Sequence, residues 1–178
     1  MNRRQFFKGS IVIGGSLVAV GTGTILLNKA DNRSDLKIST ALTRLEQLSN
    51  KKLVHTGEWD IYKIFMHCAQ SVEYSMSKFP EHKSNLFKNT IGTLAFSVFE
   101  SRGKMTHGLS EPIPGSPLFK SSLDATAAMN YLKNSLIDFE NYKGKLAPHF
   151  AYGVLTKREY EIAHVMHLYN HLEEIHDF

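Results

Sequence analysis

The sequence predicts an all-α protein, a bundle of four helices with room for one extra short helix, behind an N-terminal signal or anchor segment. Apolar residues recur every three to four positions in several stretches, which are separated by Gly, Pro and polar runs. No stretch alternates apolar and polar residues as a half-buried strand does, so no strand is expected. The 178 residues suit a single domain.

We expect the N-terminal segment to be an export signal. Arg3 and Arg4 stand before two phenylalanines, and residues 10–27 then carry no charge. A charged start followed by an apolar run is typical of an export signal. The segment RRQFFK resembles a twin-arginine signal, which the twin-arginine export machinery reads and which, by this resemblance, carries folded proteins. The alternative is a membrane tether through residues 10–27, which are at the short end for spanning about 30 Å of hydrocarbon.

The chain is therefore expected to divide into a signal or anchor, a polar linker and a helical domain, at residues 1–30, 31–35 and 36–178. Residues 1–30 hold four of the 21 basic residues and no acidic one, so the remainder carries 17 basic and 17 acidic residues. A domain without net charge produces no extended positive potential that would attract phosphates, which argues against nucleic acid as a partner. The expected location is the periplasm or the outer face of the bacterial inner membrane.

The first three helices are expected at residues 36–50, 59–78 and 84–101. Pro80 ends the second, because proline cannot continue a helix. In the first, helical spacing places on one face Leu36, Thr40, Leu42, Leu45 and Leu48. In the third, the apolar stripe comprises Leu86, Ile91, Leu94, Ala95 and Val98.

Two further helices are expected at residues 122–142 and from Thr156 to about Ile175. Ser121 or Ser122 is the expected N-cap of the first of these. Its inward-facing residues are expected to be Ala127, Ala128, Leu132, Leu136 and Phe139. The last helix begins at Thr156 with the sequence T-x-x-E, which fits a capping box.

A long loop is expected between the third and fourth helices, at residues 103–120. It contains three prolines and several glycines, which break helices. Long loops of this kind are often lids or binding loops, and a plain crossover on the bundle surface is the alternative.

Cys68 is the only cysteine, so an internal disulfide and a Cys-rich zinc site are both excluded. A free cysteine in the middle of an apolar helix is expected to be a small buried side chain.

Four aromatic or imidazole side chains share one face of the last helix. They stand at positions i, i+4, i+7 and i+11, which are Tyr160, His164, His167 and His171. Stacked buried imidazoles are hard to satisfy with ordinary hydrogen bonds, and two histidines at i and i+4 can present two nitrogens to one metal ion. His167 and His171 have that spacing, while His164 and His167 are a weaker pair at i and i+3.

A third ligand must come from elsewhere in the chain. His67, in the middle of the second helix, is the best candidate, since its face carries the mixed polar and apolar residues of a pocket wall. Spacing alone does not select it over the other candidates, which are His55, His82, His107 and His149.

Four segments in order, MHCAQSVEYSM, PIPGSP, HFAYGVLTKREY and HVMHLYNHL, resemble the DinB/YfiT-like family of metalloproteins, and an uncharacterised bacterial branch of it in particular. The resemblance spans about residues 36–176. It implies a four-helix bundle with a three-histidine metal site, whose ligands here are His67, His167 and His171. Departures from the pattern of that branch fall at Phe150, Tyr152, Tyr160 and Asn170.

The expected function is that of a metal-dependent enzyme acting on an unknown small molecule at an open coordination position. Histidine ligands suit a divalent Zn, Ni, Cu or Fe ion. Candidate residues for the pocket around the ion are Gln70, Tyr74, Tyr160, His164 and His149. The alternative is a non-enzymatic or metal-stabilised protein, closed by His164 or His149 as fourth ligand. Haem is a weaker option, and no C-x-x-C-H motif is present for covalent attachment.

Overall fold

The computed structural model describes residues 11–13, 16–18, 35–122 and 124–177, and these are mostly helical. The helical segments are α1 (Ile38–Ser49), α2 (Ile61–Met76), α3 (Asn85–Phe87), the π-helical turn η2 (Lys88–Gly92), α4 (Thr93–Arg102), α5 (Ala125–Asn141) and α6 (Lys157–Leu172). The strands are β1 (Ile11–Ile13), β2 (Ser16–Val18), β3 (Leu53–His55) and β4 (Ile175–Asp177).

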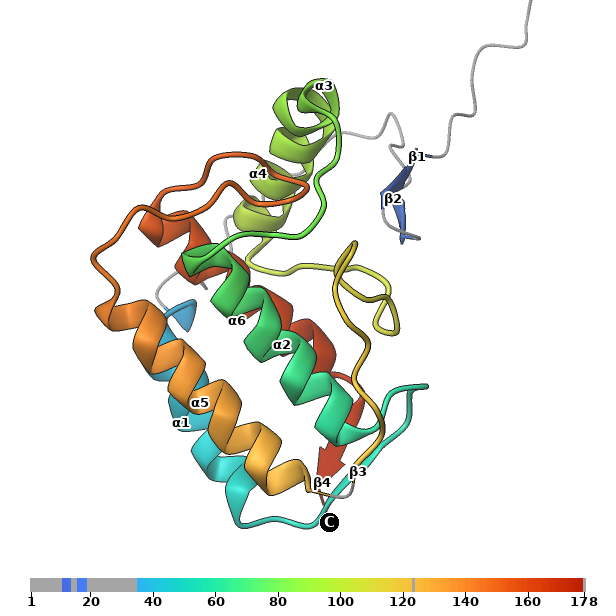
Figure 1. The fold of residues 1–178 in the computed structure, drawn as a ribbon. Coiled ribbons are helices and arrows are strands. Elements are labelled where there is room, and N and C mark those ends of the chain that lie inside the picture. The colour runs from blue at the N-terminus through green and yellow to red at the C-terminus, as the bar shows by residue number, and fades with distance from the viewer. Residues whose placement is uncertain (1–10, 14–15, 19–34, 123, 178) are drawn as a thin grey trace, which may run out of the picture.

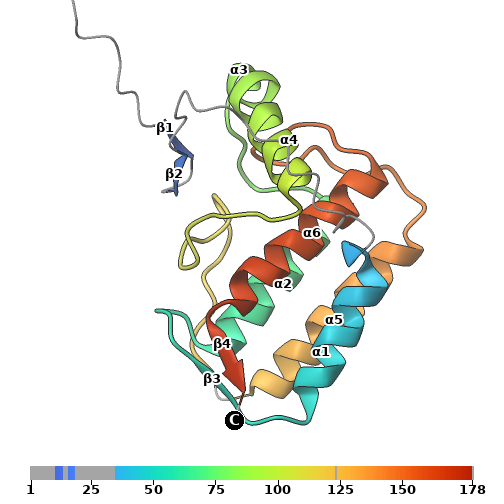
Figure 2. The same ribbon diagram turned by 180° about the vertical axis from the view of Figure 1, so that it is seen from behind.

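Four long helices surround one core. α2 packs against α5 and α6, and α1 packs against the same two helices from the other side (Figure 1). Seen from behind, α6 lies beside α2 and α1 lies beside α5, so each of the four contacts two others (Figure 2). α3, η2 and α4 form a separate helical arm at one end. The prediction of a mainly helical protein is therefore confirmed.

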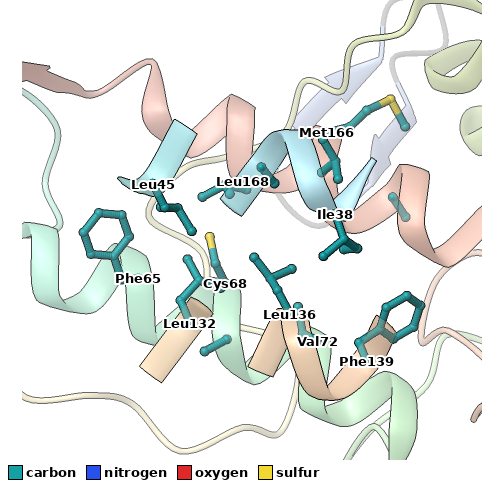
Figure 3. Close-up of a cluster of buried hydrophobic side chains, with 14 of the residues drawn as sticks. Ile38, Leu45, Phe65, Cys68, Val72, Leu132, Leu136, Phe139, Met166 and Leu168 are labelled. Atoms are coloured by element: carbon teal, nitrogen blue, oxygen red, sulfur yellow. The ribbon is translucent and has the colours of Figure 1, made fainter. Parts of the chain in front are cut away.

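The core between these helices is apolar and closely packed. α2 contributes Phe65, Cys68 and Val72, which meet Leu132 and Leu136 of α5 (Figure 3). Each such side chain stabilises the fold by about 1.5–3 kcal/mol relative to an exposed position. Cys68 is 2% exposed, and burial raises the pKa of its thiol, so it stays protonated and packs as an apolar side chain. The prediction of a buried cysteine is confirmed.

Side-chain caps fix where the long helices begin. The Asp60 carboxylate accepts a hydrogen bond from the Lys63 amide at 2.8 Å and starts α2. Thr156 starts α6 with a complete capping box, as predicted. The predicted serine cap of the fourth helix is wrong. Asp124 caps α5 instead, by accepting from the Ala127 amide at 2.9 Å, so the helix begins two to three residues later than expected.

The prediction that the domain lacks strands is wrong, because β3 and β4 pair antiparallel with Leu53 opposite Asp177. The last helix ends at Leu172, and the chain then extends so that Ile175 becomes buried, at 8% exposed. Three-residue strands are too short to show an alternating pattern. Their pairing is decided by the return of the chain end to the loop after α1, which sequence periodicity does not report.

The predicted apolar stripe of the third helix is also wrong in part. Leu86 and Leu94 are 76% and 62% exposed, whereas Gly92 and Phe96 face the body of the protein. The face that meets the body therefore lies about one residue away from the predicted stripe, and it continues from η2 into α4. Gly92 is required at this contact, since a Cβ there would lie 1.9 Å from the Ala151 carbonyl oxygen.

One smaller correction concerns the fourth helix. Ala127 is exposed, and its neighbour Ala128 faces the core. The predicted signal or anchor and linker fall almost wholly outside the described residues, apart from Asp35 and the antiparallel pair β1 and β2. Among the helices that the structure does describe, none combines the length and apolar character needed to cross a membrane.

Candidate metal centre

Helices α2 and α6 bring the three predicted ligands together. His67 lies in the middle of α2, while His167 and His171 lie one turn apart on the face of α6 that meets α2. One nitrogen of each ring can be chosen so that all three lie within 4.8 Å of one another. A hundred residues separate His67 from His167 in the sequence. The cluster therefore exists only because α2 packs against α6.

The three rings face one another edge to face. The Nε2 atoms of His67 and His167 are 3.1 Å apart. Ring centroids are separated by 4.9 Å for His67 and His167, 5.0 Å for His67 and His171, and 4.8 Å for His167 and His171. Two imidazole nitrogens bound tetrahedrally to one ion at about 2.0–2.1 Å would be about 3.4 Å apart, so the His67–His167 pair, which is within hydrogen-bonding distance, is also close to the spacing of two ligands of one cation.

His171 gives the strongest indication that this site binds a metal. The residue is 0% exposed, and neither Nδ1 nor Nε2 has a hydrogen-bond partner. In the part of the chain that the structure describes, the only other buried side-chain polar atom in this condition is Nε2 of His107. A buried polar atom without a partner costs about 1–3 kcal/mol, so such atoms indicate a group that completes them. A cation among the three rings would complete one of the two His171 nitrogens, since an imidazole gives one nitrogen to a given ion.

Burial keeps these imidazoles neutral, which is the form that binds metal. It lowers the pKa of His67 to about 3, with a smaller contribution from nearby His107. Burial and the neighbouring histidines hold the pKa values of His167 and His171 well below the usual range for histidine. The site therefore offers neutral nitrogen donors at every ordinary pH.

Two residues at the cluster were not selected from the sequence. Trp59 stacks parallel on His171, with centroids 6.2 Å apart, and meets His67 edge to face at 5.0 Å. It precedes α2, so helical spacing did not connect it to His67. His107 lies on the loop after α4, and its centroid is 4.9 Å from that of His167 and 5.0 Å from that of His171. A loop has no fixed period, so spacing could not place it.

A cavity of about 130 Å³ opens beside the cluster. His67 and His167 form part of its wall, and the loop after α4 forms another part. The remaining polar and apolar lining residues come mainly from that loop and from the segment before α6, and include His107, Glu111, Ile113, His149, Phe150 and His164. The loop at residues 103–120 therefore both crosses the bundle and walls a cavity at the histidines.

His149 and His164 line this cavity but use nitrogens for hydrogen bonds outside the cluster. The Nδ1 atom of His149 accepts from the Ala151 and Tyr152 amides, at 3.2 Å each. Nε2 of His164 lies 3.1 Å from the Ser75 hydroxyl oxygen.

The turn that carries His149 closes through backbone hydrogen bonds between His149 and Gly153. Gly153 has a φ of 81°, a conformation that favours glycine.

The other predicted pocket residues are divided. Gln70 lines a second cavity, also of about 130 Å³, which lies on the Trp59 side of His67. Tyr74 instead packs against Phe79, with centroids 5.7 Å apart. Tyr160 is fully buried, and its hydroxyl donates to the Ala147 carbonyl at 2.7 Å. Neither tyrosine is among the residues that line the two cavities beside the histidines.

These features define a mostly helical protein with a buried cluster of histidines at a small cavity. Residues 31–177 match the model of the DUF1569 family, which is described as a protein of unknown function, and the chain belongs to that family. Comparison with curated proteins and with solved structures gave no match.

The buried neutral histidines should make stability depend on pH. Burial lowers the pKa of His164 to about 3 and, with His164 and His82 nearby, holds that of His149 well below its usual range. The unfolded chain then binds more protons below about pH 6.5, so stability is complete above that pH and falls as the pH decreases. At about pH 5 each such histidine should lower the free energy of unfolding by about 2 kcal/mol relative to its value above about pH 6.5.

Thermal melting of the metal-free protein between about pH 8 and pH 5 measures this effect. His164→Asn should reduce the slope of melting temperature against pH, whereas His82→Asn, at an exposed position, should change it much less. An equal slope in wild type and His164→Asn would contradict a neutral His164.

Proposed function

We propose that the chain is an exported, metal-binding four-helix bundle of the DinB-like type, in which His67, His167 and His171 hold a divalent transition metal at the active site of an enzyme. The observation that carries the proposal is His171, whose two buried nitrogens lack partners between two other imidazoles. Three neutral nitrogen donors suit Zn, Ni, Cu or Fe. When bound, such an ion would polarise a substrate oxygen or lower the pKa of a bound water or thiol.

The cavity supports catalysis over a purely structural role for the ion. Two of the three proposed ligands, His67 and His167, line it, so a small molecule in the cavity would reach the ion directly. The chain's own residues would position that molecule. Ile113 and Phe150 present apolar surface, and Glu111 adds one carboxylate at the wall. A substrate of a few heavy atoms fits about 130 Å³.

The architecture supports the DinB-like assignment. One ligand comes from α2 and two come from the final helix, in the order that the resemblance implies. α1, α2, α5 and α6 each contact two of the others around one core, as the helices of a four-helix bundle do (Figure 1).

Export by the twin-arginine route is supported by Arg3 and Arg4 at the start of an uncharged run. Residues 10–27 would remain as a tether if the signal is not removed. A protein that folds before export could carry its metal with it.

A second candidate is a protein that binds metal without catalysis. The observation that favours it is the fourth imidazole at the cluster, that of His107. A site closed by four protein ligands is typical of structural zinc.

The metal assignment is tested by substitution of single ligands. His67→Ala, His167→Ala and His171→Ala should each lose most of the bound metal, because each removes one of the three nitrogen donors proposed to hold the ion. Elemental analysis of the purified full chain after dialysis measures this. His82→Ala and His176→Ala are matched controls at exposed positions and should retain the metal. Full occupancy in His67→Ala would overturn the three-ligand site.

Chelation separates the two candidate functions. We expect most of the helical circular dichroism signal to survive removal of the metal, because the apolar core of about 140 residues should fold without an ion. The melting temperature should fall by several degrees, since the ion stabilises the folded state by mass action. Cooperative unfolding on chelation at room temperature would instead support the metal-stabilised structural protein.

The export proposal predicts that replacing Arg3 and Arg4 together by Lys blocks delivery of the protein, because the twin-arginine machinery reads the arginine pair. Cell fractionation measures delivery. Replacing Lys8 by Arg leaves the pair intact and should not change it. Unchanged delivery of the Arg3→Lys, Arg4→Lys variant would point to another route.

A further inference from the structure

We propose that His107 is the fourth ligand of the metal, carried by the loop at residues 103–120, and that a small molecule reaches the ion by replacing it. This inference rests on the proposed metal site and adds a means by which the loop controls access to the ion. It reconciles a cavity at the cluster with the presence of a fourth imidazole.

The ring of His107 lies next to two of the three rings of the cluster. Its centroid lies 4.9 Å from that of His167 and 5.0 Å from that of His171. The three pairs within the trio span 4.8–5.0 Å. Imidazoles bound tetrahedrally to one ion have centroids about 5.2 Å apart when the metal–nitrogen distance is about 2.0–2.1 Å. Five of the six ring pairs of a four-histidine site thus have this spacing, the exception being His67 and His107, and the nitrogens that lie within 4.8 Å of one another are those of the trio.

The protonation of His107 leaves the correct nitrogen available. Nδ1 lies 2.8 Å from the Gly108 carbonyl oxygen. A carbonyl oxygen only accepts hydrogen bonds, so Nδ1 carries the proton and Nε2 carries a lone pair. That Nε2 atom is buried and has no hydrogen-bond partner. A histidine whose other nitrogen donates to a backbone carbonyl is the usual arrangement of a metal ligand.

The loop holds His107 against the helix that carries the other ligands. The His107 amide donates to the Asn170 side-chain oxygen at 3.0 Å, and Asn170 is buried next to His171 on α6. On either side of His107, Met105 and Ile113 are each 4% exposed and anchor the loop in the apolar core. The imidazole is therefore held at the cluster by bonds that do not themselves require a metal.

Replacement of His107 connects the ion to the cavity. His107, His67 and His167 all line the cavity, so a donor atom of a small anion or thiol there would stand near the coordination position that His107 takes. The exchange swaps one ligand of the ion for another, and no bond within the small molecule is broken.

The experiment uses the full chain loaded with Co²⁺, whose visible absorption is strong for four-coordinate tetrahedral sites and weak when water raises the coordination number. Wild type is compared with His107→Ala and with His82→Ala, a histidine at an exposed position. We expect a strong tetrahedral spectrum in wild type and His82→Ala. In His107→Ala we expect a weaker, shifted spectrum that free imidazole restores, together with an affinity for Zn²⁺ reduced by about tenfold or more.

The outcomes separate this inference from the metal site itself. Absence of Co²⁺ and Zn²⁺ binding in wild type would overturn both. Binding by wild type with an unchanged spectrum and affinity in His107→Ala would overturn the role of His107 and leave the trio standing. Circular dichroism of the metal-free variants checks folding, and His107→Gln, which preserves much of the side-chain volume, supplies the same comparison should His107→Ala fail to fold. Asn170→Ala, which frees the loop but keeps every ligand, should weaken Zn²⁺ binding less than His107→Ala.

Discussion

The contact between α2 and α6 is the constraint on which the candidate site depends. It places His171 out of reach of water with both nitrogens unpartnered, which costs about 1–3 kcal/mol for each such atom unless another group completes it. The apolar core offsets this cost in the metal-free chain, and a bound cation would remove the part that falls on one of the two nitrogens. The same packing that closes the core between the four long helices (Figure 3) therefore also brings together three histidines that could hold a metal ion.

The surroundings of the cluster divide into rigid and adjustable parts. Trp59 stacks on His171 and fixes the ligand rings from the side of α2, while the capped helices α2 and α6 fix the backbone. The loop at residues 103–120 is held by a few side chains instead, with Asn170 as its polar anchor. The proposed replacement of His107 by a small molecule would therefore involve the loop and not a helix, because movement of a helix would disturb the whole core.

The departures from the family pattern acquire physical roles in this arrangement. Asn170, one of the departures from the DinB-like pattern, accepts a hydrogen bond from the His107 amide and so binds the loop. Tyr152 stacks on His149 with centroids 4.3 Å apart, and helps to hold that ring at the cavity wall. Tyr160 stacks on His164 at 5.4 Å and bonds Ala147, which ties the segment before α6 to its first turns.

The sequence by itself determined the long helices, the buried thiol of Cys68, the capping box at Thr156 and the pair His167 and His171, because each depends on spacing within one segment. It could not single out His67 without the family resemblance, and it could not place His107 or Trp59, since their positions relative to the cluster depend on how distant segments pack. Tertiary structure alone decided the pairing of β3 with β4 and which face of η2 and α4 meets the body of the protein. Both arise from contacts between residues far apart in the chain, such as the approach of Gly92 to Ala151, and local periodicity carries no record of such contacts.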